Sequence, residues 1–291
     1  MNAAIFALAL LSGTMHAAWN FFSKKKASNL AVMVLGLWLA NLALLPISLI
    51  VIKFTGFDIR CIPFMIVAGA ADILYYILLI KAYRKGDISL AYPLSRGTSV
   101  LFITLFSMLL LSEAVSGRAG IGIALILCGI FSFGLARGWK LREIMNSVVA
   151  QRFAFFQGLT TVLYTLLDKF GVLYCNPMVY FNIKELAAIA VLTPFVFTDR
   201  LRTVDGVKEL VRNEWKYSAI IGFGIMGSYT IILSIYALFP EAKASYVTPI
   251  REISVVLGSI MGFIFLRERI TVNKILGILF MVLGVILIKI G

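Results

Sequence analysis

Charged side chains are scarce in this sequence. Asp, Glu, Lys and Arg together make up 14% of its 291 residues, whereas hydrophobic residues make up 61%. A soluble domain is about a quarter charged and about half apolar, so these values exclude an ordinary soluble fold. Apolar runs of about 20 residues recur along the chain instead, which is the length that a helix needs to cross the hydrocarbon core of a bilayer. The sequence therefore predicts an all-α integral membrane protein.

Residue types that bind metals or act as nucleophiles are also few. His16 is the only histidine, and the three cysteines, Cys61, Cys128 and Cys175, are too widely spaced to form a metal motif or a disulfide framework. The sequence contains no Gly-x-x-x-x-Gly-Lys-Ser/Thr pattern, so ATP hydrolysis is not expected. We therefore predict neither an enzyme activity nor a cofactor.

Ten apolar runs are candidate membrane spans. The first has no basic residue before it and is followed by Lys24, Lys25 and Lys26 rather than by a small-residue cleavage site, so we interpret it as a retained span. The predicted spans are 3–22, 30–52, 64–83, 88–111, 119–136, 153–171, 177–198, 217–239, 245–266 and 271–290. Before the eighth span, Val207 and Leu210 recur at helical spacing, which fits either a short helix on the membrane surface or a solvated linker.

The net charge of +13 comes mainly from the short connections between spans. Connections after odd-numbered spans contain sixteen Lys and Arg residues, and the opposite face contains five. The positive-inside tendency places the odd-numbered connections in the cytoplasm and both termini outside. We therefore expect a multi-pass protein of the cell (inner) membrane that contacts lipids, and we do not expect it to bind nucleic acid.

Two parts of the chain resemble each other. Residues 66–136 align without a gap on residues 221–291, so that Arg96 corresponds to Arg251. Because each half contains five spans, the second half enters the membrane from the opposite side, which produces an inverted repeat around a two-fold pseudo-axis in the membrane plane. The predicted organisation is a first five-helix repeat at 1–136, a basic cytoplasmic linker at 137–152 and a second five-helix repeat at 153–291.

Several residues of the repeat are assigned structural roles. The acids Glu113 and Glu268 lie at span ends, where a carboxylate can cap or orient the turn that follows. Glycines at seven-residue spacing in the fifth and tenth spans are expected to permit close helix packing. Prolines near the two arginines can break or hinge the helices there. These glycines and prolines are Gly122, Gly129, Gly277, Gly284, Pro93 and Pro249.

Ionisable residues inside the spans are the main candidates for function, because a charge in hydrocarbon is costly. Arg96 lies about eight residues into the fourth span, which is roughly 12 Å deep at 1.5 Å per residue. Helical spacing places aromatic and polar residues on faces with these charges, and Asp168 for example lines up with Tyr164. The residues predicted to bind substrate or to couple its transport are His16, Trp19, Asn20, Asp72, Tyr75, Tyr76, Tyr92, Arg96, Tyr164, Lys184, Glu185, Tyr229, Arg251 and Glu252.

Each of these candidates also has a structural interpretation, which stays open. Arg96 could pair with Glu252, and Lys184 with an acid on a neighbouring helix, only to hold the two halves together. The single histidine could form an interhelical hydrogen bond instead of transferring protons. The tyrosines could serve as packing alone.

Three segments are typical of one known family. They are Met15-His16-Ala17-Ala18-Trp19-Asn20, the stretch from Leu111-Ser112-Glu113 to Gly122 and Gly129, and its copy from Leu266-Arg267-Glu268 to Gly277 and Gly284. With these segments the chain resembles the drug/metabolite transporter superfamily, specifically its ten-helix EamA-type members. That family commonly has Gly before the acid, where Ser112 and Arg267 stand here. The resemblance implies a basket of ten helices around a central cavity and secondary transport, in many members the export of amino acids and other metabolites.

The leading hypothesis is a secondary active transporter, expected to be an exporter, that moves a small polar, anionic or zwitterionic organic metabolite by alternating access. Arg96 and Arg251 would engage acidic groups in turn, and Asp72, Glu185 or Glu252 would carry a coupling proton. The expected partners are this solute and a proton or counter-solute, with no obligatory protein partner. The alternative is a flippase for a lipid or a lipid-linked head group, which would need a lateral opening between helices.

Overall fold

The computed structural model describes residues 1–25, 30–85, 88–135, 148–197, 203–265, 267 and 270–291. Every regular element in these ranges is a helix. In chain order they are α1 (Ala3–Lys25), α2 (Leu30–Thr55), the short η1 (Ile59–Cys61), α3 (Ile62–Lys85), α4 (Ile88–Leu110), α5 (Gly117–Leu135), α7 (Val148–Gly171), α8 (Pro177–Val196), α9 (Val204–Leu238), α10 (Ala244–Arg251), α11 (Ile253–Phe265) and α12 (Val272–Ile290).

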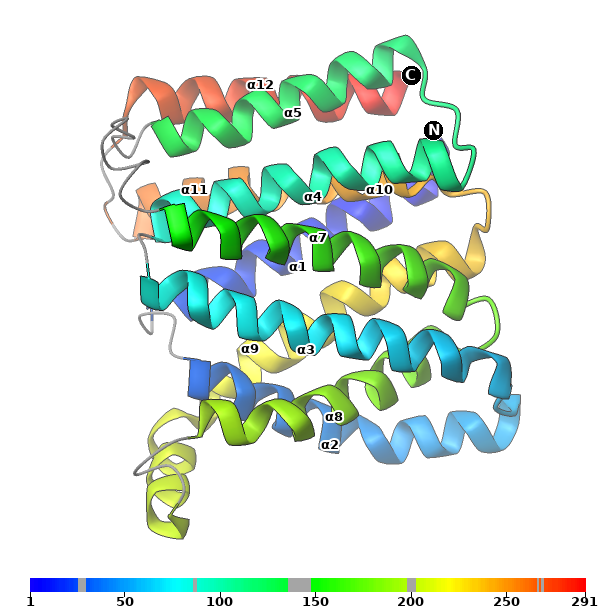
Figure 1. The fold of residues 1–291 in the computed structure, drawn as a ribbon, viewed down its shortest axis with the longest axis vertical. Helices are drawn as coiled ribbons and strands as arrows, with labels where there is room; N and C mark the ends of the chain where they lie inside the picture. The colour runs from blue at the N-terminus through cyan, green and yellow to red at the C-terminus, as the bar shows by residue number, and fades with distance from the viewer. Residues whose placement is uncertain (26–29, 86–87, 136–147, 198–202, 266, 268–269) are drawn as a thin grey trace.

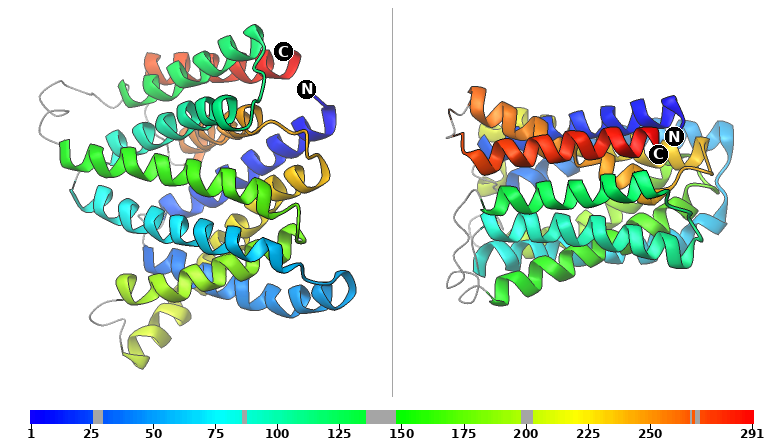
Figure 2. Two further views of the ribbon diagram at one scale, coloured as in Figure 1. Left: turned by 45° about the vertical axis from the view of Figure 1, so that its right-hand side comes forward. Right: turned by 90° about the horizontal axis from the view of Figure 1, so that it is seen from above.

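These helices form one bundle whose members run in alternating directions, with both termini on the same side (Figures 1 and 2). The prediction of ten spans is confirmed, because α10 and α11 together form the ninth. Eight of the ten are long and apolar enough to cross a membrane by the ordinary criteria. The other two are α5, whose apolar part Gly117–Ser132 is shorter, and α7, which contains Arg152, Asp168 and Lys169.

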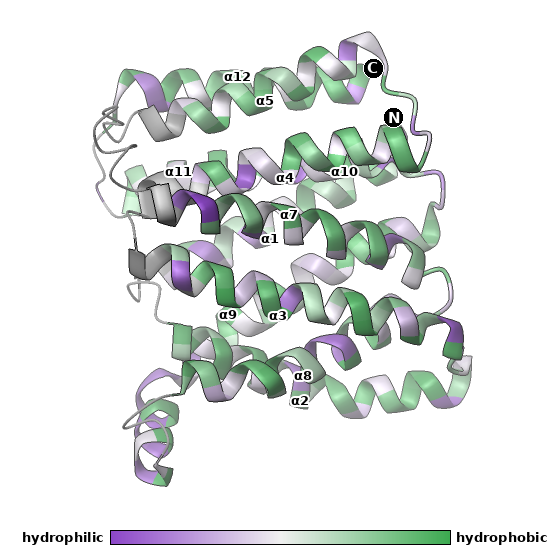
Figure 3. Cartoon of the chain, in the orientation of Figure 1, coloured by the Kyte–Doolittle hydropathy of each residue, from purple (hydrophilic) through white to green (hydrophobic). Residues whose placement is uncertain are grey.

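The outside of the bundle is apolar and its inside is partly polar. Large hydrophobic side chains such as Leu49, Leu109 and Leu279 face outward and are exposed. Figure 3 shows that hydrophobic residues prevail along the helices. Buried polar side chains include Asp72 and Asp168, so the distribution is the reverse of that in a soluble protein. The outward face is suited to lipid, and the polar interior is where function is to be sought.

Two span boundaries differ from the prediction. The helix of the eighth span begins earlier than 217, because α9 is continuous from Val204 and its charged first turns project beyond the bundle (Figure 1). Val207 and Leu210 lie in these first turns, so the predicted short helix is continuous with the span. The ninth span is broken at Glu252, three residues after Pro249. The break considered at Pro93 is absent, since α4 continues through it.

The two halves pack as an inverted repeat. The contact between α1 and α9 has its counterpart in that between α3 and α7, and each pair joins the first span of one half to the third span of the other. In the α5–α12 pair, a Cβ built at Gly284 would lie 2.5 Å from the carbonyl oxygen of Gly122. A Cβ at Gly129 would lie 2.8 Å from the oxygen of Gly277. The expected role of these glycines in close packing is confirmed, and their antiparallel pairing lies on the pseudo-axis.

Glu113 joins the two halves on the side that holds the termini. Its carboxylate accepts hydrogen bonds from Lys169 Nζ at 2.6 Å and from the backbone amides of Ala244 and Ser245 at 2.9 and 3.0 Å. It therefore caps α10 of the other half rather than the turn that follows it. Burial alone would raise the pKa of Glu113, but the hydrogen bonds from Lys169 and Ser245 outweigh it and lower the pKa. Glu268, its counterpart, lies outside the described residues, as does most of the linker predicted at 137–152.

Ser112 and Arg267 have φ angles of 53° and 52°. This left-handed conformation is strained for residues with a Cβ and is easy for glycine. It explains why glycine is common before the acid in the family that the sequence resembles.

Candidate functional site

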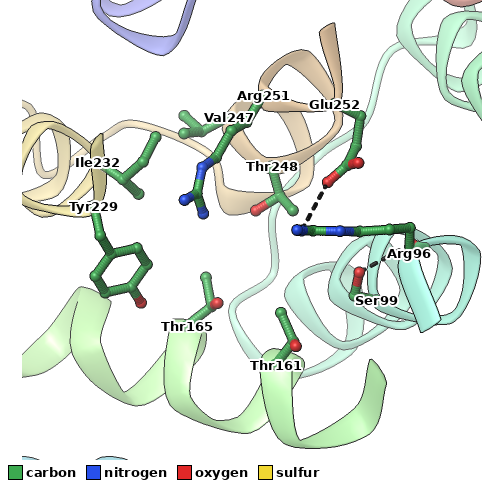
Figure 4. Close-up of a pocket in the computed structure, with 10 residues that line it drawn as sticks. All are labelled: Arg96, Ser99, Thr161, Thr165, Tyr229, Ile232, Val247, Thr248, Arg251 and Glu252. Atoms are coloured by element: carbon green, nitrogen blue, oxygen red, sulfur yellow. Dashed lines mark hydrogen bonds and ion pairs between the residues drawn. The ribbon is translucent and has the colours of Figure 1, made fainter. Parts of the chain in front are cut away.

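A narrow cavity lies where α4 of the first half meets α7, α9 and α10 of the second half. Its walls come from α4 and α7 on one side and from α9, α10 and the break after α10 on the other (Figure 4). The volume is about 10 Å³, which is room for about one water molecule. An organic solute could enter only if the walls moved apart. The lining residues are Arg96, Ser99, Thr161, Thr165, Tyr229, Ile232, Val247, Thr248, Arg251 and Glu252.

Arg96 and Glu252 face each other across this cavity. The distance from Arg96 Nη1 to Glu252 Oε1 is 3.5 Å, at the long limit of a hydrogen bond. The exposed fraction of the two side chains is 15% and 3%, so water screens the pair only slightly. The other oxygen of Glu252 is buried without a hydrogen-bond partner among the described residues. The pairing considered from the sequence is therefore present, but it is loose and leaves an acceptor unused.

His16 lies between the two equivalent arginines. Its Nε2 is 2.8 Å from Arg96 Nη2, and its Nδ1 is 3.0 Å from Arg251 Nη2. Guanidinium groups only donate hydrogen bonds, and a neutral imidazole accepts at only one of its two nitrogens. One of these contacts thus brings two donors together. The Nε of Arg251 is also buried and has no partner within the described part of the chain. Arg251 therefore has a buried donor that no side chain in the described part of the site accepts.

A second group of charges lies beside the cavity, and we call Asp72, Asp168, Lys184 and Glu185 the lysine cluster. Lys184 Nζ is 2.6 Å from Asp168 Oδ2 and 2.9 Å from Asp72 Oδ2. The exposed fraction of the Lys184 and Asp168 side chains is 0%. Glu185 points to a different neighbour and accepts a hydrogen bond of 3.0 Å from the hydroxyl of Tyr76. The interhelical pairing of Lys184 considered from the sequence is present, with two acids rather than one.

Aromatic rings enclose the ammonium group of Lys184. The ring centroids of Tyr164, Tyr180, Phe181 and Tyr229 lie 5.3 to 5.9 Å from Nζ. These distances are within the range of cation–π attraction. The hydroxyls of Tyr180 and Tyr229 also donate to the two oxygens of Asp168, at 2.8 and 2.7 Å. The tyrosines therefore do more than fill space, because they satisfy a buried carboxylate.

Tyr229 connects the lysine cluster to the cavity. Its hydroxyl donates to Asp168, whereas its ring forms part of the cavity wall and lies 5.5 Å from the guanidinium carbon of Arg251 (Figure 4). A change of charge in the cavity and a change of charge in the lysine cluster therefore both act on Tyr229.

The remaining predicted residues surround this arrangement. The Trp19 ring lies edge-on to His16 at 4.8 Å, and the Tyr75 ring packs against Tyr76 and Tyr164. The amide of Asn20 donates to the backbone oxygen of His16 in its own helix, so it is not directed at the cavity. The side chain of Tyr92 lies outside the described residues.

Some residues of the site are absent from the candidates predicted from the sequence. Asp168 is the most important, and its signal was present, since it is an acid in an apolar run on the same face as Tyr164. Thr248 and Ser99 also share helical faces with Arg251 and Arg96. Thr161, Thr165 and Tyr180 give no such signal, because Thr and Tyr are common in membrane helices for packing. The residues not predicted are Ser99, Thr161, Thr165, Asp168, Tyr180, Ile232, Val247 and Thr248.

Comparison with known proteins gives two findings. The sequence model of the EamA-like transporter family matches residues 3–135 and 150–290. A solved crystal structure of another protein matches with a TM-score of 0.73 at 11% identity, and the match covers 100% of this chain and 99% of the other. At this identity the second finding shows a common fold only. The first covers both halves of the bundle.

Proposed function

Because the chain belongs to the EamA-like transporter family, we propose that it is a secondary carrier for a small anionic or zwitterionic organic metabolite. Membership of this family means that the chain is a membrane transporter of small molecules. The finer proposal concerns the charge of the solute, the site that binds it and the way in which it crosses the membrane.

The unpartnered Nε of Arg251 and the contact of His16 with both arginines support an anionic group on the solute. A carboxylate or phosphate offers several acceptor sites and can take two parallel hydrogen bonds from one guanidinium group. Such a group would supply acceptors for the Arg251 Nε, which has no partner within the described residues, and for the arginine nitrogen that now faces a donor on His16. The threonines and the Tyr229 ring of the cavity suit the polar and apolar parts of an organic molecule.

The position of the cavity supports alternating access. It lies where α4 of the first half meets the second half of an inverted repeat, and such symmetry provides two conformations of similar energy that open to opposite sides. Arg96 and Arg251 occupy equivalent positions in the two halves, so either arginine can be the main contact of the solute when the site faces one side of the membrane. In the present conformation the bonds of Glu113 to Lys169, Ala244 and Ser245 tie the halves together on the side of the termini.

We propose that the protein lies in the cell membrane with both termini outside. The connections at the opposite end of the bundle contain the larger share of the basic residues, which the positive-inside tendency places in the cytoplasm. The direction of net flow is set by the gradients and not by the cavity. Export remains the expectation from the family resemblance.

A binding screen tests the proposed solute class. Purified protein would be heated with individual amino acids, amines, phosphonates and sugar phosphates, and a ligand would be recognised by a raised Tm. We expect acidic compounds to stabilise the wild type. Arg251→Lys should weaken binding by roughly 10- to 100-fold, because a hydrogen bond to a charged group contributes about 1.5–3 kcal/mol.

The matched control for this screen is Arg60→Lys, which changes an exposed arginine paired with Asp58 outside the cavity. Stabilisation by amines alone, or equal affinity in Arg251→Lys, would contradict the anionic solute. Stabilisation only by anionic lipids would favour the flippase.

A further inference from the structure

The cavity and the lysine cluster together contain one more acid than base. The basic side chains are Arg96, Arg251 and Lys184, and the acidic ones are Asp72, Asp168, Glu185 and Glu252. An uncompensated carboxylate inside a bilayer costs several kcal/mol or more, so a buried site with a surplus acid is expected to hold a proton instead. The question is which of the four acids holds it.

The contacts single out Glu185. Asp72 and Asp168 both lie within 3 Å of Lys184 Nζ, and Glu252 lies 3.5 Å from Arg96. Glu185 is buried to 1% exposure, and no cation lies within ion-pair distance of it among the described contacts. Its recorded partner is the Tyr76 hydroxyl, which donates to Oε1 and leaves Oε2 able to take a proton.

The other bases of the helices that pack around Glu185 lie away from it. Lys81 is exposed near the end of α3, Lys169 is paired with Glu113, and the lysines and arginine of α9 lie in its first turns. The only ionisable side chain of α2 is Lys53, near the far end of that helix. Helix α3 contributes Asp72, Tyr75 and Tyr76, and α7 contributes Asp168 and Tyr164. Helix α9 contributes Tyr229, and α8 itself contributes Tyr180 and Lys184, whose ammonium group is directed to the two aspartates.

We propose that Glu185 is a proton-binding site separate from the solute cavity, and that the proton bound there crosses the membrane together with the solute. The proton comes from water on one side, bonds to a carboxylate oxygen of Glu185 and is released to water on the other side. Tyr76 keeps its own proton throughout. This inference rests on the proposed carrier function and names its coupling ion.

Electrostatics favours binding of both species in the same conformation. An anionic group at Arg96 and Arg251 adds negative charge to a buried region that already has a surplus acid, and charges interact strongly where little water screens them. Tyr229 lies between the two sites, with its ring at Arg251 and its hydroxyl on Asp168. Because the sites are separate, solute and proton do not compete. The proton gradient can therefore drive the solute in the direction in which protons flow. With an inward proton gradient this direction is into the cell, so the export that the family resemblance implies requires an outward solute gradient that exceeds the proton gradient.

The proton itself is the first probe. Infrared difference spectra of the protein in liposomes, recorded between two pH values, should contain the carbonyl band of a buried protonated carboxylic acid. That band should be lost in Glu185→Gln, which keeps the size of the side chain and an acceptor for Tyr76. It should remain in Glu241→Gln, a matched change at an exposed turn. Persistence of the full band in Glu185→Gln would overturn the assignment.

Coupling is tested with the amino acid, phosphonate or sugar phosphate that shows the strongest counterflow in liposomes. An imposed pH gradient should make the wild type and Glu185→Asp accumulate this compound on the alkaline side. Glu185→Gln should retain counterflow but lose the accumulation. Counterflow in the wild type without any accumulation in the pH gradient would overturn this inference, as would full accumulation by Glu185→Gln. Either result would leave the carrier function intact. Absence of wild-type counterflow for every compound would instead refute the carrier function on which this inference rests.

Discussion

Lys184 offers the sharpest test of the buried charge network, through the substitution Lys184→Met. Methionine has nearly the length of lysine and no charge, so the change removes the ammonium group and leaves little empty space. Two carboxylates, Asp72 and Asp168, would then face each other with side-chain exposures of 10% and 0%. They would have neither a cation nor water to compensate them.

The expected loss follows from these contacts. Removing one partner of a buried ion pair typically costs about 3–5 kcal/mol, because the other charge stays buried and unpaired. Here a single ammonium group serves two acids at 2.6 and 2.9 Å and also faces four aromatic rings, which places the loss toward the upper part of that range. Proton uptake by one aspartate would recover part of it. We expect about 4 kcal/mol, or about three decades in the unfolding equilibrium constant.

The assay is reversible unfolding in mixed micelles, followed by helical circular dichroism. Lys53→Met serves as the control, since it removes an exposed lysine at the end of α2 and should change stability by less than about 0.5 kcal/mol. The double variant Lys184→Met/Asp168→Asn should be more stable than Lys184→Met alone, because it also removes one of the stranded charges. Wild-type stability in Lys184→Met, or strictly additive losses in the double variant, would refute the network.

Three further predictions concern the rest of the fold. Gly284→Ala should destabilise the α5–α12 pair by about 1–3 kcal/mol, whereas Gly258→Ala, where a Cβ meets nothing within 4 Å, should not lower the Tm. Because the folded-state pKa of Glu113 is lowered from its usual 4.5, its stabilising contribution is present above that value and is lost as the pH falls through the folded-state pKa. Unfolding measured against pH should therefore show an acid-dependent loss that is missing in Glu113→Gln. In a cysteine-free background, Glu241→Cys should react with an impermeant thiol reagent in intact cells. Val204→Cys should react only in permeabilised cells, because the two positions lie at opposite ends of α9. The reverse pattern would contradict the orientation with the termini outside.

The sequence predicted the architecture well because the rules that apply are strong. Hydrocarbon thickness sets the length of the spans. The alignment of Arg96 with Arg251 reveals a repeat, and the odd number of spans in each half requires the two halves to have opposite orientations. The prediction of close contact at Gly122 and Gly284 also succeeded, because small residues at regular spacing have one dominant use in membrane helices. The continuous start of α9 was not foreseen, since a helix that leaves the bilayer has the same periodicity as one that lies on its surface.

The candidate site was predicted less completely. Single ionisable residues such as Lys184 stand out in an apolar run, but a sequence does not show which charges meet across helices. The contact of His16 with both arginines joins three different spans, and the partnership of Lys184 with Asp168 joins two. Thr161 and Thr165 could not be distinguished from packing residues, because their role depends on which face of the helix meets the cavity.

Counterflow in liposomes tests the central claim most directly. Vesicles containing the purified protein would be loaded with an unlabelled acidic amino acid or sugar phosphate, and the entry of the same labelled compound would be followed. We expect saturable entry in the wild type, little entry in Arg96→Ala and Arg251→Ala with the fold retained, and normal entry in Arg60→Ala. Unimpaired entry in both cavity variants would contradict a solute site at the arginine pair.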